Sequence, residues 1–299
     1  MNQVQPRIAV LMTCHNRRDL TLACLRLLQR QDLFQGEDLF LVDDGSSDGT
    51  GAAVRALIPA ANVIAGDGSL FWNGGMRLAW QEAKARGGHD FYLWLNDDVA
   101  LGDDCLAMLV ADADASAPRG EPVIVAAATI EPGGSRITYS GQRRTRADRP
   151  LRLSLLAPVG NPIPADTVSG NIVLVSAAAE RVLGNLLPDF EHIYGDLDYG
   201  LRARMAGVPV LLASRPGGTC AANATTGSSL DPELSLFRRL ALYRAETRKI
   251  HGRDWRRFVA LHGGGAAAQL GHWLMPYLRL LLARPNRHAA RIISGKDGA

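Results

Sequence analysis

The residues best suited to chemistry are acids that follow apolar segments. Asn96-Asp97-Asp98 comes directly after the apolar run at residues 91–95. Mg²⁺ or Mn²⁺ is bound by one or two carboxylates together with phosphate oxygens, and a cation held in this way neutralises a departing diphosphate. The competing interpretation is an Asx-type turn that only ends the strand. Because similar polar clusters follow other apolar segments, we favour the metal site.

A second acidic cluster, Asp43-Asp44, opens a Gly- and Ser-rich segment at residues 43–50. Such a segment is typical of a turn and a helix cap. A carboxylate here can also accept a hydrogen bond from a pyrimidine N–H group or from ribose hydroxyls. The position of the cluster, directly after the apolar residues 39–42, favours the binding role.

Residues 67–77 combine glycines with polar side chains. The glycines allow the backbone to approach a ligand closely. Asp67, Asn73 and Arg77 are the candidates for ligand contact, and Arg77 can pair with a phosphate group. Trp72 fits either core packing or a wall of the site.

Two further acids, Asp196 and Asp198, lie at the start of a helical pattern in which Leu197, Leu201 and Met205 share one face. Acids at a helix N-terminus are often only caps. Beside a donor site, one of the two is a good candidate for the base that takes a proton from an acceptor hydroxyl. Their spacing does not decide which.

These clusters require elements that bring them together. Residues 7–12, 39–42, 63–64 and 91–95 are predicted strands, and helical patterns separate most of them. The fold class is therefore α/β, with a mostly parallel central sheet and helices on both faces. Ligands of such sheets bind beyond the carboxyl ends of the strands. Four predicted strands in succession end in polar residues there: 13–17, 43–44, 66–68 and 96–98.

The remaining chain is predicted less sharply. The first helix is expected to bury a face made of Leu20, Cys24, Leu27 and Leu28. Residues 131–166 hold six arginines and five prolines, and we expect mainly loop. From about residue 234 the pattern is helical. The predicted domains are a catalytic domain at 1–235 and a basic C-terminal helical extension at 236–299.

Composition limits the function classes. Cys14, Cys24, Cys105 and Cys220 show no paired spacing, which argues against a zinc site or disulfide framework. Only five apolar residues separate Arg7 from Thr13, too few for a secretory signal. We expect a protein of the cytoplasm, either free or peripheral at the cytoplasmic face of the inner membrane, that does not bind nucleic acid.

The C-terminal segment is basic. Residues 238–299 carry 13 Lys and Arg against three acids, although the whole chain is only +3. Polar residues interrupt the apolar stretch 261–283, so a membrane span is not expected. The segment is predicted either to contact an anionic membrane surface or to fill an intramolecular core or homodimer interface, through the apolar residues Trp255, Phe258, Trp273, Leu274, Tyr277 and Leu278.

Taken in order, four segments over residues 7–230 resemble the family-2 glycosyltransferases, which have the A-type nucleotide-sugar-binding fold. The residues 67–77 are similar to a bacterial rhamnosyltransferase-like branch of surface polysaccharide synthesis. The matching segments are Val-Leu-Met-Thr-Cys-His-Asn-Arg at 10–17, Leu-Val-Asp-Asp-Gly-Ser-Ser-Asp-Gly-Thr at 41–50, Trp-Leu-Asn-Asp-Asp-Val at 94–99, and Tyr-Gly-Asp-Leu-Asp-Tyr-Gly-Leu-Arg-Ala-Arg-Met-Ala-Gly at 194–207.

The resemblance implies roles for individual residues. Asp98 is implied as the metal ligand and Asp196 as the catalytic base, with Asp198 supporting the base or binding acceptor. Thr13, with Asp43 or Asp44, would hold the nucleoside. The segment Ser169-Gly170-Asn171 is implied near the sugar pocket. The remaining expected donor contacts are Asn16, Arg17, Asp67, Asn73, Arg77, Asn96 and Asp97.

Three departures from the family pattern stand out. Asn96 replaces the first acid of the Asp-x-Asp metal motif, and Gly195 replaces the Glu before the base. Residues 219–223 lack the His with which many members bind metal or diphosphate. The absence of a Gln-x-x-Arg-Trp motif argues against a processive polymer synthase.

The resemblance and the residues together predict an inverting, metal-dependent glycosyltransferase. It would use Mn²⁺ or Mg²⁺ and a nucleotide-diphosphate sugar to glycosylate a hydroxyl of a saccharide or lipid-linked acceptor. Two rivals are a catalytically weak nucleotide-sugar-binding protein and a sugar nucleotidyltransferase. The second would need an N-terminal Gly-rich loop with Arg and Lys, where this chain has Thr-Cys-His-Asn-Arg.

Overall fold

The computed structural model describes residues 5–146, 149–222, 227–229, 231, 233–248 and 250–282. The chain divides into two compact units, Met1–Ala222 and Asn223–Ala299. The first unit contains all the polar clusters that were predicted to form the site.

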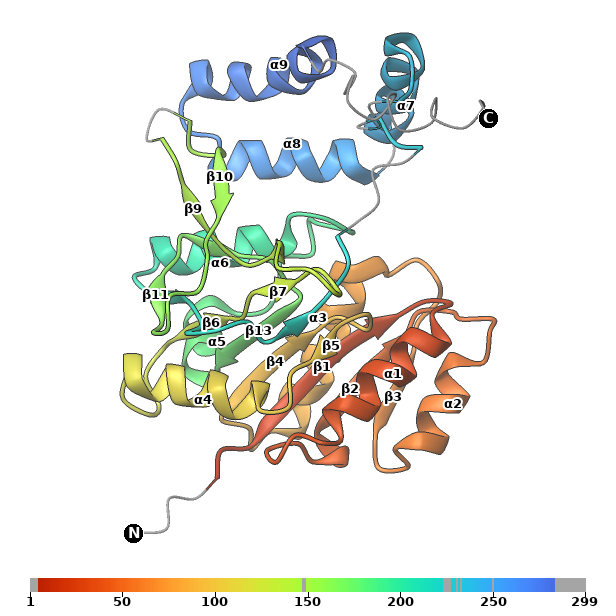
Figure 1. The fold of residues 1–299 in the computed structure, drawn as a ribbon, viewed down its shortest axis with the longest axis vertical. Coiled ribbons are helices and arrows are strands. Elements are labelled where there is room, and N and C mark those ends of the chain that lie inside the picture. The colour runs from red at the N-terminus through yellow and green to blue at the C-terminus, as the bar shows by residue number, and fades with distance from the viewer. Residues whose placement is uncertain are drawn as a thin grey trace, which may run out of the picture. The chain divides into compact units, whose positions relative to one another are not determined.

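The first unit is built on a central eight-stranded sheet (Figure 1). Its strands are β1 (Ile8–Cys14), β2 (Leu39–Asp43), β3 (Asn62–Ala65), β4 (Phe91–Leu95), β6 (Ile124–Ala126), β11 (Ile163–Pro164), β13 (Ile172–Ser176) and β14 (Val210–Leu212). Their spatial order is β11-β14-β6-β13-β4-β1-β2-β3. The four strands predicted in the N-terminal region are therefore neighbours, as the α/β pattern requires.

The sheet is mixed, with a parallel half that carries the polar strand ends. The pairs β1–β2, β2–β3 and β1–β4 are parallel, so these strands end at the same edge. Strand β13 runs antiparallel to both of its neighbours, β4 and β6. As a result, the start of β13, at Ile172, lies opposite Leu95 at the end of β4. The residues just before β13 thus reach the same edge.

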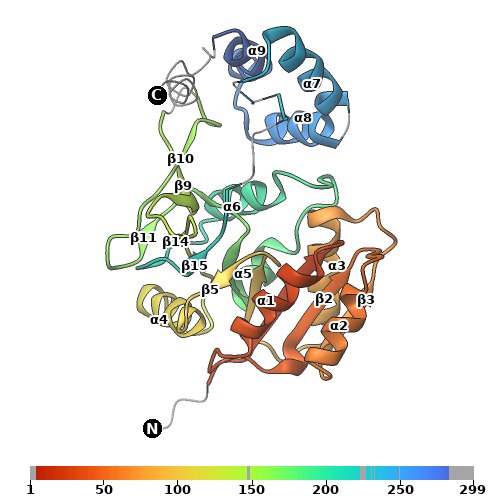
Figure 2. The same cartoon turned by 45° about the vertical axis from the view of Figure 1, so that its right-hand side comes forward.

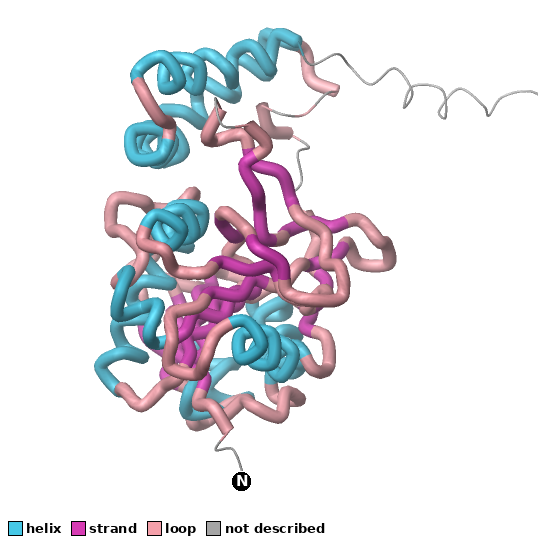
Figure 3. Tube along the Cα trace, turned by 90° about the vertical axis from the view of Figure 1, so that its left-hand side faces the viewer, coloured by secondary structure: helices cyan, strands magenta, loops and turns pink. Residues whose placement is uncertain are grey.

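Helices cover both faces of the sheet, which confirms the expected layers (Figures 2 and 3). Alternate strand residues point to opposite faces: Val10 packs with α1 residues, whereas Leu11 packs with Trp80 of α3. One core contains residues of α1 (Arg18–Leu28), α2 (Thr50–Leu57) and α4 (Cys105–Ser116), and the other contains residues of α3 (Phe71–Arg86), α5 (Ala177–Leu183) and α6 (Gly195–Met205).

Two predicted helix faces were partly wrong. Leu20 of α1 is 49% exposed, while Thr21 beside it is fully buried. Met205 of α6 is 76% exposed, and Tyr199 and Ala203 fill the core instead. In both helices a residue that the apolar spacing had left out belongs to the buried side.

Residues 131–166 are mainly loop, as expected, but some of them form short strands that the sequence did not predict. Within the described residues this region contributes several short strands, which pair with distant segments in the central sheet and in two smaller sheets with the orders β10-β9-β12 and β5-β15-β7-β8. The strands of the smaller sheets are β5 (Ala100–Leu101), β7 (Thr129–Ile130), β8 (Ile137–Tyr139), β9 (Gly141–Arg144), β10 (Leu153–Leu155), β12 (Thr167–Val168) and β15 (Gly218–Thr219). A 3-10 turn, η1 (Gly36–Asp38), precedes β2.

The second unit is helical, as expected from residue 234 onward. It contains α7 (Leu236–Arg248), α8 (Ile250–His262) and α9 (Ala266–Leu282). Phe258 of α8 is buried, whereas Trp273, Leu274, Tyr277 and Leu278 of α9 are exposed. In the described part of the chain, no helix is both long and apolar enough to cross a membrane.

Candidate active site

An arginine holds two acids together at the end of β4. Arg17, just before α1, donates from Nη1 to Asp97 Oδ1 at 2.8 Å and from Nη2 to Asp98 Oδ2 at 3.1 Å. Asp97 is buried and also accepts a bond from Thr21 Oγ1 at 3.3 Å. Burial raises the pKa of Asp97 to about 6, and Arg17 acts in the opposite direction. Asp98 is the more accessible of the two, with 24% of its side chain exposed.

Cys220 is the residue that sequence reasoning missed at this place. Its Sγ lies 3.6 Å from Asp98 Oδ1, and Asn171 Nδ2 lies 3.7 Å from the same sulfur. Burial, followed by Asp98, raises the pKa of Cys220 to about 12, so the thiol is neutral at ordinary pH. The sequence could have indicated Cys220, because it lies within residues 219–223, where the His of many family members is missing.

The donor atoms around Asp98 fit a divalent cation that shares its coordination with a substrate. Across the described ranges, no group of three or more His, Cys, Asp and Glu side chains could hold a metal ion by itself. Mg²⁺ in phosphate-transfer sites is usually bound by one or two carboxylates plus phosphate oxygens and water. Asp98, the more accessible acid, is the candidate carboxylate for such a partial site, and its Oδ2 is bonded to Arg17 in this structure.

Trp72 forms a wall that joins the acidic loop to α6. Its Nε1 donates to Asn96 Oδ1 at 2.8 Å, and its ring meets that of Trp94 edge-on at 6.2 Å. On the other side its ring covers Gly170, where an added Cβ would lie 2.6 Å from a ring carbon. A glycine is therefore required at 170. Trp72 fits both of the roles expected for it, because it packs on Trp94 and also contacts Asn96 and Gly170.

Asp196 lies beside Gly170, in the first turn of α6. Its Oδ2 accepts a hydrogen bond from the Gly170 N–H at 2.8 Å, and its Oδ1 accepts one from the Leu197 N–H at 2.8 Å. Burial raises the pKa of Asp196 above its ordinary value, and these two N–H groups partly oppose that shift. A carboxylate whose pKa is raised is a better proton acceptor near neutral pH.

Asp198 is not placed to bind an acceptor. It is fully buried and accepts a hydrogen bond from Arg202 Nε at 2.8 Å, one helical turn further on. Of the two acids, Asp196 is therefore the partly exposed candidate for the base, whereas Asp198 is buried and paired with Arg202.

Asn73 and Arg77 both bond to main-chain carbonyls of the segment that precedes α6. Asn73 is fully buried, and its Nδ2 donates to the carbonyls of Leu187 at 2.9 Å and Phe190 at 2.7 Å. Arg77 Nε donates to the Leu186 carbonyl at 2.8 Å. Both side chains fasten α3 to the segment that precedes α6. The cation beside the acidic loop is Arg17 instead.

The same Asn73 explains why residue 195 lacks a side chain. A Cβ added at Gly195 would lie 2.0 Å from Asn73 Oδ1, which is far inside any contact distance. The family's Glu cannot fit before the base while Asn73 keeps this position.

Asp44 shapes a loop, which leaves Asp43 as the candidate for nucleoside contact. Asp44 is buried, and its two carboxylate oxygens accept bonds from the N–H groups of Gly68 at 2.8 Å and Phe71 at 2.9 Å. Asp43 is half-buried and accepts from the Ser46 N–H at 3.1 Å. The binding role expected for Asp44 is therefore not supported by its contacts.

The other predicted residues gather at the same edge of the sheet. Asn16 links two loops, since its N–H donates to Ser46 Oγ at 2.9 Å and its Oδ1 accepts from the Ser47 N–H at 2.8 Å.

Thr13 is half-buried at the end of β1. Asp67 is exposed, and its Oδ1 accepts from both the N–H and the hydroxyl of Ser69. Ser169 is buried and accepts from Gln142 Nε2 at 3.0 Å.

Comparison with known proteins adds a sequence match to this geometry. The family model described as "Glycosyl transferase family 2" matches residues 9–163, slightly more than half of the chain. The match includes the acidic loop with Asp98 and ends before Gly170, Asp196 and Cys220. A search of curated proteins found no match.

Three solved structures share the fold at low identity. A GalNAc-T7 structure with UDP, GalNAc and Mn²⁺ aligns with a TM-score of 0.58 and 12% identity, over 98% of this chain and 57% of that one. The mannosyltransferase PcManGT of Pyrobaculum calidifontis, with GDP-Man and Mn²⁺, aligns at 0.50 with 16% identity, over 93% of this chain and 81% of that one. Residues 1–349 of S. aureus TarS align at 0.50 with 13% identity, over 95% and 82%. This chain thus spans little more than half the length of the GalNAc-T7 structure.

Proposed function

The chain belongs to glycosyl transferase family 2, and from this premise we propose that it transfers a sugar, with inversion, from a nucleotide-diphosphate sugar to an acceptor hydroxyl. The observation that carries the proposal is the continuous contact from the acidic loop to Asp196. Asn96 accepts a bond from Trp72, Trp72 covers Gly170, and the Gly170 N–H binds Asp196. This continuity supports a single site that holds a donor diphosphate and deprotonates an acceptor.

In this mechanism each residue has a separate task. Thr13 and Asp43 hold the nucleoside at the ends of β1 and β2. Asp98 is the carboxylate that would bind Mn²⁺ or Mg²⁺, and the cation would neutralise the leaving diphosphate. Asp196 takes the acceptor proton as the hydroxyl oxygen bonds to the anomeric carbon. The bond from that carbon to the diphosphate oxygen breaks at the same time, so the configuration inverts.

Donor hydrolysis or transfer, measured with and without Mn²⁺, tests this proposal. A thermal-shift screen of nucleotide sugars would first identify the donor, because a ligand that binds only the folded state raises the melting temperature. We expect Mn²⁺-dependent release of a nucleoside diphosphate. Donor binding without any release would favour a nucleotide-sugar-binding protein. Release of inorganic pyrophosphate from a nucleoside triphosphate and a sugar phosphate would favour a nucleotidyltransferase.

A bacterial surface polysaccharide is the product class that fits the resemblance of residues 67–77, with a saccharide or lipid-linked acceptor. We further propose a cytoplasmic protein that contacts anionic membranes through its second unit. The apolar side chains of Trp273, Leu274, Tyr277 and Leu278 are exposed on α9, and Arg253, Arg256 and Arg257 are exposed on α8. Each basic residue near anionic lipid contributes about 1 kcal/mol. Residues 283–299, which carry several of the charges counted above, lie outside the described residues.

Vesicle co-sedimentation checks the membrane contact. We expect the full chain to sediment with vesicles of phosphatidylcholine and phosphatidylglycerol, to stay in solution with phosphatidylcholine alone, and to be released by high salt, because the attraction is screened. The double variant Trp273→Ser, Tyr277→Ser should weaken sedimentation. Absence of binding to either vesicle, with a dimer that these substitutions dissociate, would assign the apolar residues to a homodimer interface.

A further inference from the structure

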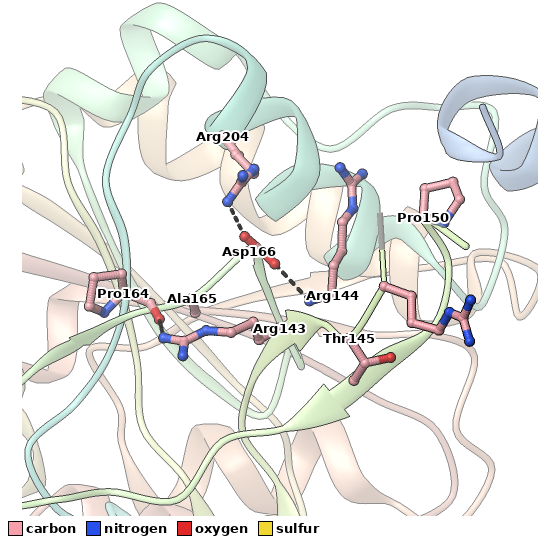
Figure 4. A pocket seen from close by; sticks show the side chains of 9 residues that line it. Arg143, Arg144, Thr145, Pro150, Pro164, Ala165, Asp166 and Arg204 are labelled. Carbon is pink, nitrogen blue, oxygen red and sulfur yellow. Dashed lines mark hydrogen bonds and ion pairs between the residues drawn. The ribbon is translucent and has the colours of Figure 1, made fainter. Parts of the chain in front are cut away.

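Six arginines lie between residues 131 and 166, and the site described above uses none of them. Three of them, Arg143, Arg144 and Arg146, line a pocket of about 590 Å³ together with Arg204 of α6 (Figure 4). Of the described residues that line this pocket, Asp166 alone is acidic. Arginines therefore outnumber acids among the described residues that line the pocket.

The single acid is already occupied. Asp166 Oδ2 accepts a hydrogen bond from the main-chain N–H of Arg144 at 2.6 Å, and its Oδ1 is paired with Arg204 Nη1. The Nε of Arg144 is buried and, in the part of the chain that the structure describes, has no hydrogen-bond partner. Burial lowers the pKa of Arg144; Asp166 opposes this and Arg204 adds to it. Arg144 thus lacks a bonded counter-charge, and a buried donor without a partner is costly.

Two connections link the pocket to the candidate base. Ser169 lies three residues after Asp166, about 10 Å along an extended chain, and Gln142 Nε2 binds the Ser169 hydroxyl. Along α6, Arg204 comes eight residues after Asp196, about 12 Å at the helical rise. A phosphate-bearing acceptor would have to span about this distance to present its hydroxyl to Asp196.

We propose that this arginine pocket binds a phosphate group of the acceptor, which makes the acceptor an anionic, phosphate-bearing molecule. A planar guanidinium matches two phosphate oxygens at once, and charge-assisted bonds of this kind are stronger than neutral ones. The phosphate would accept a hydrogen bond from the Nε–H of Arg144, and the positive charges of Arg143 and Arg204 would attract it. This inference rests on the proposed glycosyl transfer, because it places the pocket on the acceptor side of Asp196.

Titration of the full chain with inorganic pyrophosphate tests the pocket. Calorimetry in EDTA removes the contribution of a divalent cation at Asp98. We expect Arg144→Gln to weaken pyrophosphate binding about tenfold or more, the range for losing a hydrogen bond to a charged group. Arg144→Lys should retain part of the affinity, since it keeps charge without the planar fork. The control Arg136→Gln removes an exposed arginine that pairs with Glu131 outside the pocket, and should change nothing.

A second arm separates the two sources of phosphate. Phosphatidylcholine vesicles with and without farnesyl diphosphate present a lipid-borne diphosphate. If Arg144→Gln weakens retention by the farnesyl diphosphate vesicles as well as pyrophosphate binding, the acceptor is lipid-linked. Loss in the pyrophosphate arm alone points to a soluble phosphorylated acceptor. Equal pyrophosphate affinity of wild type and Arg144→Gln, or no binding by wild type, would overturn the proposal.

Donor binding keeps this failure distinct from failure of the proposed function. Nucleoside diphosphate binding with Mn²⁺ should be the same in wild type and Arg144→Gln, and Asp98→Ala should bind pyrophosphate in EDTA like wild type. Intact Mn²⁺-dependent donor turnover without a pyrophosphate response would reject the pocket alone. Circular dichroism melting should show that Arg144→Gln folds, because the buried Nε of Arg144 has no hydrogen-bond partner among the described residues.

Discussion

Asp196→Asn is expected to lower the rate of sugar transfer by roughly two to four orders of magnitude, the usual range for losing a general base. The amide keeps the size of the carboxylate and can still accept hydrogen bonds from the N–H groups of Gly170 and Leu197. It cannot take a proton from the acceptor. Donor affinity should therefore stay near wild type while kcat falls, which steady-state kinetics and calorimetry measure separately.

The pH profile gives a second readout of the same residue. A base acts only when it is deprotonated, and burial raises the pKa of Asp196. The acid limb of kcat should therefore lie above the ordinary carboxylate value of about 4, and it should disappear in Asp196→Asn. Asp114→Asn is a suitable control, because Asp114 forms an exposed ion pair with Arg119 on the surface. Turnover of Asp196→Asn close to wild type would move the role of base to another group.

Asp98→Ala is expected to abolish the Mn²⁺ dependence of nucleoside diphosphate binding. In wild type the cation should tighten binding, because it joins Asp98 to the phosphate oxygens. Loss of a group that only hydrogen-bonds to a metal ligand lowers metal affinity about 10- to 100-fold. Loss of the ligand itself should lower the affinity at least as much. The fold should survive, since Arg17 keeps its bond to the buried Asp97. Calorimetry with and without Mn²⁺ checks this.

Asp103→Ala provides a matched control for that experiment. Asp103 lies five residues further along, is 82% exposed and pairs with Arg30 at the surface. It should bind nucleoside diphosphate like wild type. An unchanged Mn²⁺ response in Asp98→Ala would show that the metal assignment is wrong, and Asp97 with Cys220 would then be the groups to examine.

The parts of the fold that could be predicted are those where one local signal dominates. The uninterrupted apolar run at residues 91–95 became β4 with the same bounds, because a strand buried on both faces needs apolar residues throughout. The α1 face was partly wrong for a different reason. Thr21 is buried and donates hydrogen bonds to the Arg17 carbonyl and to Asp97. A polar residue buried in this way does not contribute to the apolar spacing from which the helix face was predicted.

Long-range pairing accounts for what could not be predicted. The short strands β9 and β12 pair with each other across residues 141–168, and strands of two to four residues have no periodicity of their own. In the candidate site, residue types identified Asp98 and Asp196 as candidates. The contact between Cys220 and Asp98 joins residues 122 positions apart, and only the folded chain shows it.

Because Gly195 lies so close to Asn73, the residue types at these two positions depend on each other. A mutational path that restores an acidic residue at 195 must first shorten residue 73, because the Cβ and the amide oxygen cannot share the same space. That first step would break the two bonds by which Asn73 holds the Leu187 and Phe190 carbonyls, each worth on the order of 1 kcal/mol. Each single substitution from the present pair is therefore destabilising: an acid at 195 alone meets the clash, and a shorter residue 73 alone loses these bonds. A concerted change at residues 73 and 195 is what would admit an acidic side chain before Asp196.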